Sequence, residues 1–381
     1  MRILHVTPYL SPVFGGPSFV VKSMAECGSE EGHEVDVVST FGGIEKRNNE
    51  STSLFNLQES KARFKLFPRC FPEGIFHSPS LNAWLRAHAK TYDLIHLHVP
   101  FTQPFRNAVL IADRLKIPFV VTPHGVFDQW SLRQKSWKKK PYFVFFEKQR
   151  VSRASVIHAC SDLELTSLTG LDFGPPIRKV ELAVYPPRWK VGERDELTEK
   201  RILFIGRLHP VKGIPNLLEA LRILKTRGLR VYLDIAGAGD EKYENWLKGM
   251  VLSLGIADEV VWHGFVDQQK RTSLLARAYC LALVSLHESF GLVGAEALTM
   301  GVPLVVGDQV GISSRVHEFG AGEVVFCNKP IGIANAFARL LQEKENRDAR
   351  AGALRLTQKH FGMHAFSKNL SAMYDEAITR I

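Results

Sequence analysis

Short apolar runs alternate with amphipathic stretches along the whole chain, and this alternation limits the possible folds more than any other feature. Strands that are buried on both faces read as continuous β-branched and apolar runs, and the helices that connect parallel strands cover those faces. The alternation therefore predicts an α/β fold with parallel sheets. The predicted strands are Arg2–Val6, Glu34–Ser39, Arg63–Phe67, Asp93–Leu97, Pro118–Thr122, Ser155–His158, Arg201–Ile205, Arg230–Ala236, Glu259–Trp262, Leu281–Ser285, Pro303–Val306 and Glu323–Phe326. The amphipathic stretches include Ile214–Arg227, Tyr243–Leu254 and Ile333–Glu345.

The alternation restarts near residue 200, after a segment that begins with Tyr185-Pro186-Pro187. A chain of 381 residues is also too long for one core of ordinary size. We therefore predict two doubly wound, Rossmann-like domains that face a central cleft. The predicted bounds are 1–185 for the first domain, 186–200 for a linker, 201–364 for the second domain and 365–381 for a helix that returns to the first.

The composition is that of a globular protein from a reducing compartment. Apolar residues make up 45% of the chain and charged residues 23%, as in soluble domains. The five cysteines are far apart and lack a C-x-x-C pair, which argues against a disulfide framework or a zinc cluster. The chain starts directly with an apolar strand, and no run reaches the ~18 apolar residues of a membrane span. We expect a cytoplasmic protein without a secretory leader.

The formal charge of +10 is concentrated in the segment 133–153. This segment holds eight basic residues against Glu147 alone, and aromatic residues such as Trp137, Tyr142 and Phe145 lie between them. Basic residues beside aromatic ones suit an anionic membrane surface, a polyanionic acceptor or nucleic acid. The alternative is a solvated basic helix whose aromatic face belongs to the core. Membrane attachment and this alternative both stay open, and nucleic acid is not expected as a partner.

Glycines and polar residues follow several of the predicted strands, which is where open α/β sheets bind their ligands. Gly15-Gly16-Pro17 follows the first strand, and its glycines allow a close approach of backbone to ligand. His124-Gly125 follows a later strand of the same domain, and this loop position favours a functional histidine. Gly206-Arg207 and Glu288–Glu296 follow strands of the second domain. These loops are expected to line the central cleft.

Two cations, Arg207 and Lys212, follow the strand Arg201–Ile205 at a turn that begins with Gly206. Arginine binds phosphate through a planar, bidentate guanidinium, and lysine adds a mobile point charge. Together they can neutralise a departing diphosphate. The alternative, two surface cations beside a turn, is weakened by the acidic segment that comes later in the chain.

That acidic segment, Glu288–Glu296, places two carboxylates around a glycine turn that opens an apolar helix. Carboxylates accept hydrogen bonds from sugar hydroxyls, and the amides at a helix start bind phosphate. A helical path would separate Glu288 from Glu296 by ~12 Å of rise, roughly the length of a sugar diphosphate. Glu296 also lies in an otherwise apolar helix, where a charge needs a partner. The segment therefore predicts a nucleotide-sugar site.

His96 and His98 alternate along one predicted strand and share a face, which raises the question of a metal ion. No set of cysteines or carboxylates at ligand spacing accompanies them. We therefore expect no metal site.

Taken together, these residues resemble the retaining glycosyltransferases of family 4, which have the two-domain architecture called GT-B. The pairing of the Arg/Lys element with the spaced glutamates is the specific part of the resemblance. Where such enzymes often carry Pro-Asn-Gly before the linker, this chain has Val184-Tyr185-Pro186-Pro187-Arg188. The matching pieces run in the family's order over nearly the whole chain: Gly15-Gly16, Thr122-Pro123-His124-Gly125, Gly206-Arg207-Leu208 with Lys212-Gly213, His263-Gly264, Glu288 through Glu296, and Gly301-Val302-Pro303.

The resemblance implies a role for each matching residue. Arg207 and Lys212 would bind the diphosphate of the donor, and Glu288 would bind the transferred sugar. His124 would lie near the reacting centre or the primary hydroxyl of the sugar, and Glu296 would hold the ribose. The implied catalytic set is thus His124, Arg207, Lys212 and Glu288. The implied donor-binding set is Gly16, Gly206, Gly264, Phe265, Phe290, Gly291, Leu292, Val293 and Glu296.

The implied reaction is metal-independent transfer with retention, from a nucleotide-diphosphate sugar to a hydroxyl of a saccharide or lipid-linked acceptor. No cofactor is needed beyond the donor substrate itself. The basic and aromatic segment would hold the enzyme at the inner face of a membrane, as a peripheral protein in bacterial surface polysaccharide synthesis. Two alternatives remain: a nucleotide-sugar epimerase of the same architecture, and a non-catalytic scaffold that binds sugar nucleotides.

Overall fold

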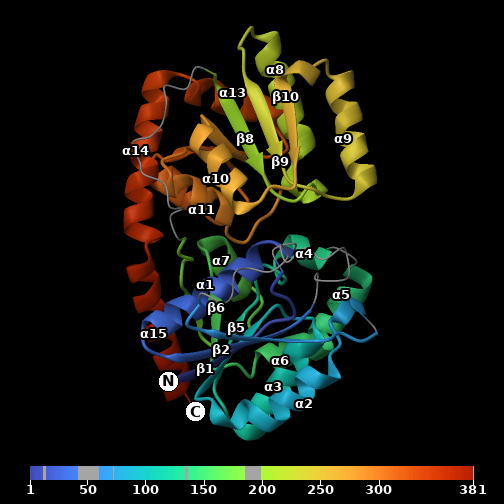
Figure 1. Cartoon of the computed structure of the whole chain (residues 1–381), viewed down its shortest axis with the longest axis vertical. Coiled ribbons are helices and arrows are strands. Elements are labelled where there is room, and N and C mark those ends of the chain that lie inside the picture. The colour runs from blue at the N-terminus through green and yellow to red at the C-terminus, as the bar shows by residue number, and fades with distance from the viewer. Residues whose placement is uncertain (12–13, 42–59, 72, 134–135, 185–198, 381) are drawn as a thin grey trace. The chain divides into compact units, whose positions relative to one another are not determined.

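The computed structural model describes residues 1–11, 14–41, 60–71, 73–133, 136–184 and 199–380 (Figure 1). The chain forms two compact units. The first comprises Met1–Ala183 together with Met363–Ile381, and the second comprises Val184–Gly362. The predicted domain ends at 185 and 364 lie two residues from these boundaries. Nearly all of the predicted linker, 186–200, lies outside the described residues.

Seven parallel strands form the sheet of the first unit, in the order β3-β2-β1-β4-β5-β6-β7. The order reverses between β1 and β4, and such a reversal creates a crevice beyond the carboxyl ends of the two strands. The strands are β1 (Arg2–Val6), β2 (Glu34–Thr40), β3 (Arg63–Phe67), β4 (Leu94–His98), β5 (Phe119–Thr122), β6 (Val156–Ala159) and β7 (Ile177–Lys179). The helices are α1 (Gly16–Glu30), α2 (Pro79–His88), α3 (Gln103–Leu115), α4 (Gln129–Arg133), α5 (Ser136–Tyr142), the π-helical turn η6 (Phe143–Glu147), α6 (Lys148–Val151), α7 (Asp162–Thr169) and α15 (Met363–Thr379), with short turns η4 (Glu73–Ile75) and η5 (Ala89–Thr91).

The last helix, α15, belongs to the first unit although it follows the second in sequence. It is the red helix that runs beside α1 in Figure 1, and it also contacts β4, β5 and β6. The hydroxyl of Tyr374 lies 2.8 Å from Nδ1 of His96 on β4, and Arg178 forms an ion pair with Glu376 at 2.6 Å. These contacts bind the C-terminal segment to the first sheet.

Six parallel strands form the sheet of the second unit, in the order β10-β9-β8-β11-β12-β13. Here the order reverses between β8 and β11. The strands are β8 (Arg201–Ile205), β9 (Tyr232–Ala236), β10 (Val260–Gly264), β11 (Cys280–Leu283), β12 (Leu304–Gly307) and β13 (Gly322–Val325). The helices are α8 (Ile214–Thr226), α9 (Glu241–Ser253), α10 (Gln268–Arg277), α11 (Leu292–Thr299), α12 (Ser313–Glu318), α13 (Pro330–Leu340) and α14 (Glu343–His360), with short turns η7 (Pro210–Lys212) and η8 (Ala257–Glu259).

The predicted fold class is confirmed, with two corrections to its elements. The predicted helix Ile333–Glu345 is wrong, because α13 ends at Leu340 and α14 begins at Glu343. Gln342 is extended there, and acidic residues in the first turn of α14 favour a new helix start. The strand β7 was not predicted, because its three residues, Ile-Arg-Lys, form no apolar run.

The central strands carry the core of the first unit. Every residue of β4, β5 and β6 is buried, including His96, His98 and His158. Buried polar side chains need hydrogen-bond partners, so these histidines require an explanation. Among the described residues, no helix has both the length and the apolar character that a bilayer crossing requires.

Candidate functional site

The first element of the candidate site is the turn after β8, where a glycine permits close contact between two strand ends. Gly213 has a φ of +67° and leads into α8. A Cβ atom at this position would lie 2.2 Å from the carbonyl oxygen of Val284, which directly follows β11. Glycine tolerates both this φ and this contact. The close approach holds Lys212, the preceding residue, beside the end of β11.

Lys212 and Glu288 form the centre of the site in the second unit. Nζ of Lys212 lies 3.0 Å from Oε2 of Glu288, and both side chains are largely buried. The hydroxyl of Ser285 donates to the same carboxylate oxygen at 3.0 Å. The backbone N–H of Glu288 donates to the carbonyl of Gln309, and its carbonyl accepts from the N–H of Gly311. The Glu288 carboxylate is therefore fixed by the segments that follow β11 and β12.

Arg207 supplies a second cation at the end of β8. Its side chain is exposed, and it has no hydrogen bond or ion pair with any residue that the structure describes. The charge of Lys212 is balanced by Glu288, whereas the charge of Arg207 is not balanced in this way. Arg207 is thus available to an anionic ligand. The preceding residue, Gly206, contacts the next loop so closely that a Cβ on Gly237 would lie 1.8 Å from the Gly206 carbonyl oxygen.

A glycine turn opens α11, as the sequence predicted. Gly291 has φ 106° and ψ 51°, and α11 begins only at Leu292. Glu288 instead forms an isolated bridge with Val310. The segment is therefore not helical throughout, and the rise of ~12 Å that a continuous helix would give between Glu288 and Glu296 does not apply to it. Gly291, in a left-handed conformation, ends the bridged segment and begins the turn into α11.

The start of α11 presents backbone donors rather than side chains. The first amides of a helix, here those of Leu292 and Val293, have no acceptor within the helix and suit an anion. The side chain of Phe290 is only 4% exposed and packs against the ring of Phe361. Phe290 therefore contributes to the core with its ring, and its backbone alone is suited to a ligand.

Glu296 has an unpredicted partner, Arg271 on α10. Nη2 of Arg271 donates to Oε2 of Glu296, and both side chains are mostly buried. Burial raises the pKa of Glu296, and the charge and hydrogen bond of Arg271 oppose that shift. The sequence indicated that Glu296 needs a partner, but no pattern in α10 singles out Arg271.

Gly264 and Phe265 lie at the carboxyl end of β10. Gly264 has a φ of +63°, and its carbonyl accepts a hydrogen bond of 2.7 Å from the N–H of Gly237. The Phe265 side chain is 70% exposed. An exposed aromatic ring at this edge of the sheet offers a flat apolar face on which a planar ligand can stack.

Gly16 and His124 belong to the first unit, whereas the other predicted site residues belong to the second. Gly16 is the first residue of α1 and follows Gly15, which has a φ of 78°. His124 follows β5 and has a φ of 56°, an unusual value for a residue with a side chain. The next N–H, that of Gly125, donates to Oε1 of Glu164 at 2.7 Å. This buried carboxylate, which the sequence did not reveal, fixes the loop of His124.

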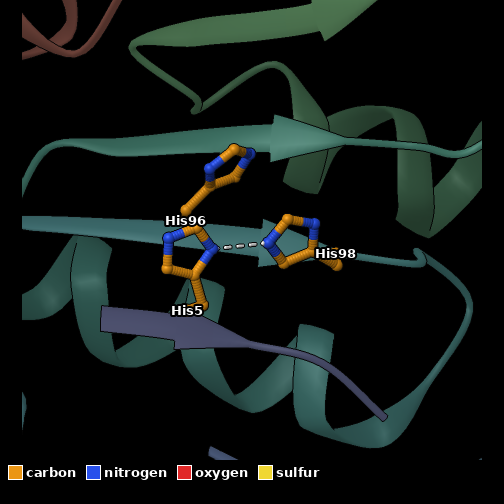
Figure 2. A group of neighbouring side chains, drawn as sticks. All are labelled: His5, His96 and His98. Atoms are coloured by element: carbon orange, nitrogen blue, oxygen red, sulfur yellow. Dashed lines mark hydrogen bonds between the residues drawn. The ribbon is translucent and has the colours of Figure 1, made fainter. Parts of the chain in front are cut away.

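His5 on β1 joins His96 and His98 in a buried group (Figure 2). One nitrogen from each ring lies within 4.8 Å of the others, a spacing that a metal ion accepts. However, His96 uses both ring nitrogens, at 2.8 Å from the hydroxyl of Tyr374 and at 2.7 Å from that of Thr122. His5 Nδ1 and His98 Nε2 lie 3.0 Å apart and bond to each other, as the dashed line in Figure 2 shows. Since these ring nitrogens already make hydrogen bonds, the group fits a hydrogen-bond network better than a metal site.

Both halves of the chain match known glycosyltransferase families. Residues 14–182 match the family described as Glycosyltransferase Family 4, and residues 187–354 match Glycosyl transferases group 1. An uncharacterized glycosyltransferase of Methanocaldococcus jannaschii is 28% identical over 363 residues, which cover 90% of each chain. A D-inositol 3-phosphate glycosyltransferase of Actinosynnema mirum is 28% identical over 328 residues, which cover 79% of this chain and 76% of the relative.

Solved structures show the same architecture. The structure of Anabaena HepE in complex with UDP-glucose has a TM-score of 0.76 at 19% identity, and the match covers 98% of this chain and 99% of HepE. Two Rossmann-like domains with this topology define the GT-B class of glycosyltransferases. Within that class, the chain belongs to glycosyltransferase family 4 and is a glycosyltransferase.

Proposed function

We propose that this enzyme moves a sugar from a nucleotide-diphosphate sugar to a hydroxyl of a saccharide or lipid-linked acceptor, with retention of configuration and without a metal ion. The observation that carries the proposal is the meeting of Lys212 and Glu288 beside the start of α11. β8 and β11, which bring these groups together, are the strands between which the sheet order reverses. Open α/β sheets bind their ligands at such a reversal. The UDP-glucose bound to HepE supports a nucleotide sugar as the donor class.

The proposed reaction assigns a different task to each charged group. The acceptor hydroxyl attacks the anomeric carbon from the side of the leaving group, the bond to the diphosphate breaks, and the hydroxyl proton passes to the departing phosphate. Arg207 and Lys212 stabilise the charge that develops there, and the amides at the start of α11 add to this effect. Electrostatic stabilisation of this kind lowers a barrier by roughly 3–4 kcal/mol per well-placed donor. Glu288 accepts hydrogen bonds from the sugar, and no covalent nucleophile is required.

A lipid-linked acceptor is supported by the exposed side chains around η6. Trp137, Val144, Phe145 and Phe146 are 75%, 55%, 65% and 52% exposed, whereas Phe143 is buried. The alternative in which the aromatic face belongs to the core therefore explains only part of this segment. Exposed apolar side chains among basic residues fit the surface of an anionic bilayer. We propose that this surface attaches the enzyme to a membrane, as in bacterial surface polysaccharide synthesis.

Vesicle co-sedimentation tests the attachment separately from the reaction. Wild type should bind anionic vesicles more strongly than neutral ones, and Phe145→Ser should reduce that binding severalfold. Phe71→Ser is the matched control, because Phe71 is 88% exposed in the same unit but lies outside the basic segment. Equal binding to both vesicle types, or equal loss in the two variants, would contradict the proposal.

A donor screen tests the reaction itself. Wild type and Glu288→Ala are incubated with a panel of UDP-, GDP- and ADP-sugars, and slow hydrolysis is followed by release of the nucleoside diphosphate. One donor should be consumed by wild type and spared by Glu288→Ala, while Glu318→Ala, which alters an exposed carboxylate on α12, should behave as wild type. Release of an altered sugar from the donor without an acceptor would favour an epimerase. Neither turnover nor calorimetric binding of any donor would favour a scaffold.

A further inference from the structure

A small pocket of the second unit lies between α10 and one face of the sheet, and its volume is about 150 Å³. The sheet contributes Arg201 from β8, Asp234 from β9, and Val261 and His263 from β10. Alternate residues of a strand share a face, and Asp234 pairs in register with Val261, which explains why these side chains meet. None of these four side chains belongs to the donor-binding set that the resemblance implies.

One face of α10 forms the other wall of the pocket. Lys270, Leu274 and Arg277 are four and three positions apart, which is the spacing of neighbours on a helix surface. Leu274 is buried, whereas the side chains of Lys270 and Arg277 are exposed. Within the described part of the chain, neither cation has an ion pair or a side-chain hydrogen bond. The helix therefore brings two uncompensated positive charges to the pocket.

The carboxylate that lines the pocket, Asp234, already has partners. It is 5% exposed, and it accepts hydrogen bonds from Nη1 of Arg201 at 3.1 Å and from Nε2 of His263 at 2.8 Å. Arg201 also forms an ion pair with Glu199 at 2.9 Å. Buried carboxylates need such partners, so Asp234 is explained by Arg201 and His263. The charges of α10 stay available to a ligand.

Volume and charge together define the class of this ligand. A cavity of about 150 Å³ holds a molecule the size of benzene, whereas pockets for drug-sized ligands measure roughly 300–1,000 Å³. A phosphate group therefore fits, and a whole nucleotide sugar is too large. Arginine binds phosphate through its planar guanidinium, and lysine adds a mobile point charge. The pocket offers one of each.

We propose that this pocket binds a phosphate group, either the free ion or the monoester of a small metabolite, between Lys270 and Arg277. The site is separate from the predicted donor site: Arg201 begins β8, whereas Arg207 and Lys212 follow the end of that strand. The proposal goes beyond the transfer reaction, because no step of that reaction uses this pocket.

Phosphate binding is measured in the full-length enzyme labelled with ¹⁵N-histidine. The ring signals of His263 are assigned by their loss in His263→Gln. They are followed while inorganic phosphate replaces chloride at fixed pH and ionic strength, so that screening stays constant. The signals should shift and reach a plateau, because His263 lines the pocket. Signals that do not move, or that move without a plateau, would overturn the proposal.

Glutamine variants of the two cations test their role. Lys270→Gln and Arg277→Gln should each weaken phosphate binding roughly tenfold, the effect of one charge-assisted hydrogen bond. Lys242→Gln and Arg347→Gln are the matched controls, because both side chains are exposed in the same unit but lie outside the pocket. The controls should bind phosphate as wild type does. Equal weakening in all four variants would reveal a general effect of net charge and contradict the site.

Arg207→Ala separates this pocket from the predicted diphosphate site, which could also attract inorganic phosphate. The midpoint of the His263 response should be the same in Arg207→Ala as in wild type. A response that is lost in Arg207→Ala but kept in Lys270→Gln would locate the phosphate at the donor site and overturn the proposal.

A titration with glycerol 3-phosphate distinguishes the two sources of the phosphate group. A lower midpoint than that of inorganic phosphate supports a metabolite monoester as the ligand. A higher midpoint supports the free ion.

Discussion

Acidification should destabilise the first domain through its buried histidines. Burial lowers the pKa of His5 and His124 to about 3 and that of His158 to about 4, and it lowers the pKa of His96 and His98 well below 6.5. The unfolded chain therefore binds more protons than the native chain as the pH falls from about 7 to about 4. The free energy of unfolding must fall over that window, because the extra protons stabilise the unfolded state.

The size of this loss follows from the protonation of the unfolded chain, because the native rings stay neutral. At pH 5 an imidazole with an unfolded pKa of 6.5 is roughly 97% protonated, whereas the native ring is neutral. A histidine whose native pKa is about 4 or lower then removes about 2 kcal/mol between pH 8 and pH 5, so that His5, His124 and His158 together remove about 6 kcal/mol. His96 and His98 act in the same direction. Glu164 acts in the opposite direction, because burial raises its pKa to about 7, and it offsets about one histidine. The net loss in the free energy of unfolding is comparable to the whole stability of a domain.

Urea unfolding of wild type and His158→Gln at pH 8 and pH 5 checks this magnitude. Hydrogen exchange of peptides from β4 and β5 identifies the transition of the first domain. The variant should lose about 2 kcal/mol less than wild type between the two pH values, and the contribution of Glu164 cancels in this comparison. His88→Gln, an exposed histidine on α2, should lose as much as wild type. The same loss in wild type and His158→Gln would refute the reasoning.

Three further predictions concern the second domain. Arg207→Ala should lower kcat/KM for the donor roughly 10²–10³-fold, the effect of removing one well-placed charge donor, and a loss below threefold in steady-state kinetics would contradict its role. Gly213→Ala should destabilise the domain by about 3 kcal/mol or more, because its Cβ would meet a carbonyl oxygen at 2.2 Å. Gly228→Ala has a similar φ but open space around the added Cβ, so its thermal midpoint should fall less, and equal shifts would argue against the contact. Arg271→Ala should lower the free energy of unfolding by about 2 kcal/mol, because it leaves the mostly buried Glu296 unpaired. Adding Glu296→Gln to the same chain should recover part of that loss. Additive effects of the two substitutions in denaturant unfolding would contradict the pairing.

The sequence predicted the parallel sheets, because apolar periodicity is a local property, and its residue chemistry singled out Lys212 and Glu288 but not Arg271, the partner of Glu296. It could not predict that Lys212 and Glu288 bond to each other, since that contact depends on the neighbouring positions of β8 and β11 in the sheet. Nor could it predict that Glu288 pairs with Val310, because that bridge is a long-range interaction.

The buried histidines of the first unit show the same limit. His96 and His98 were visible as a pair on one face of a strand. Their roles diverge in the structure, because His96 bonds to α15 and β5 whereas His98 bonds to His5 and His124. Only the parallel pairing of β1 with β4, which aligns His5 with His96, brings His5 into the group.

Retention at the anomeric carbon is the most direct test of the proposed chemistry. The donor identified by the screen is hydrolysed by a large amount of enzyme, and ¹H NMR records the first anomer of the released sugar before mutarotation. Transfer to the face of the leaving group predicts that an α-linked donor releases the α-anomer first. Initial release of the β-anomer would contradict a retaining reaction and would require a water or acceptor that attacks from the opposite face.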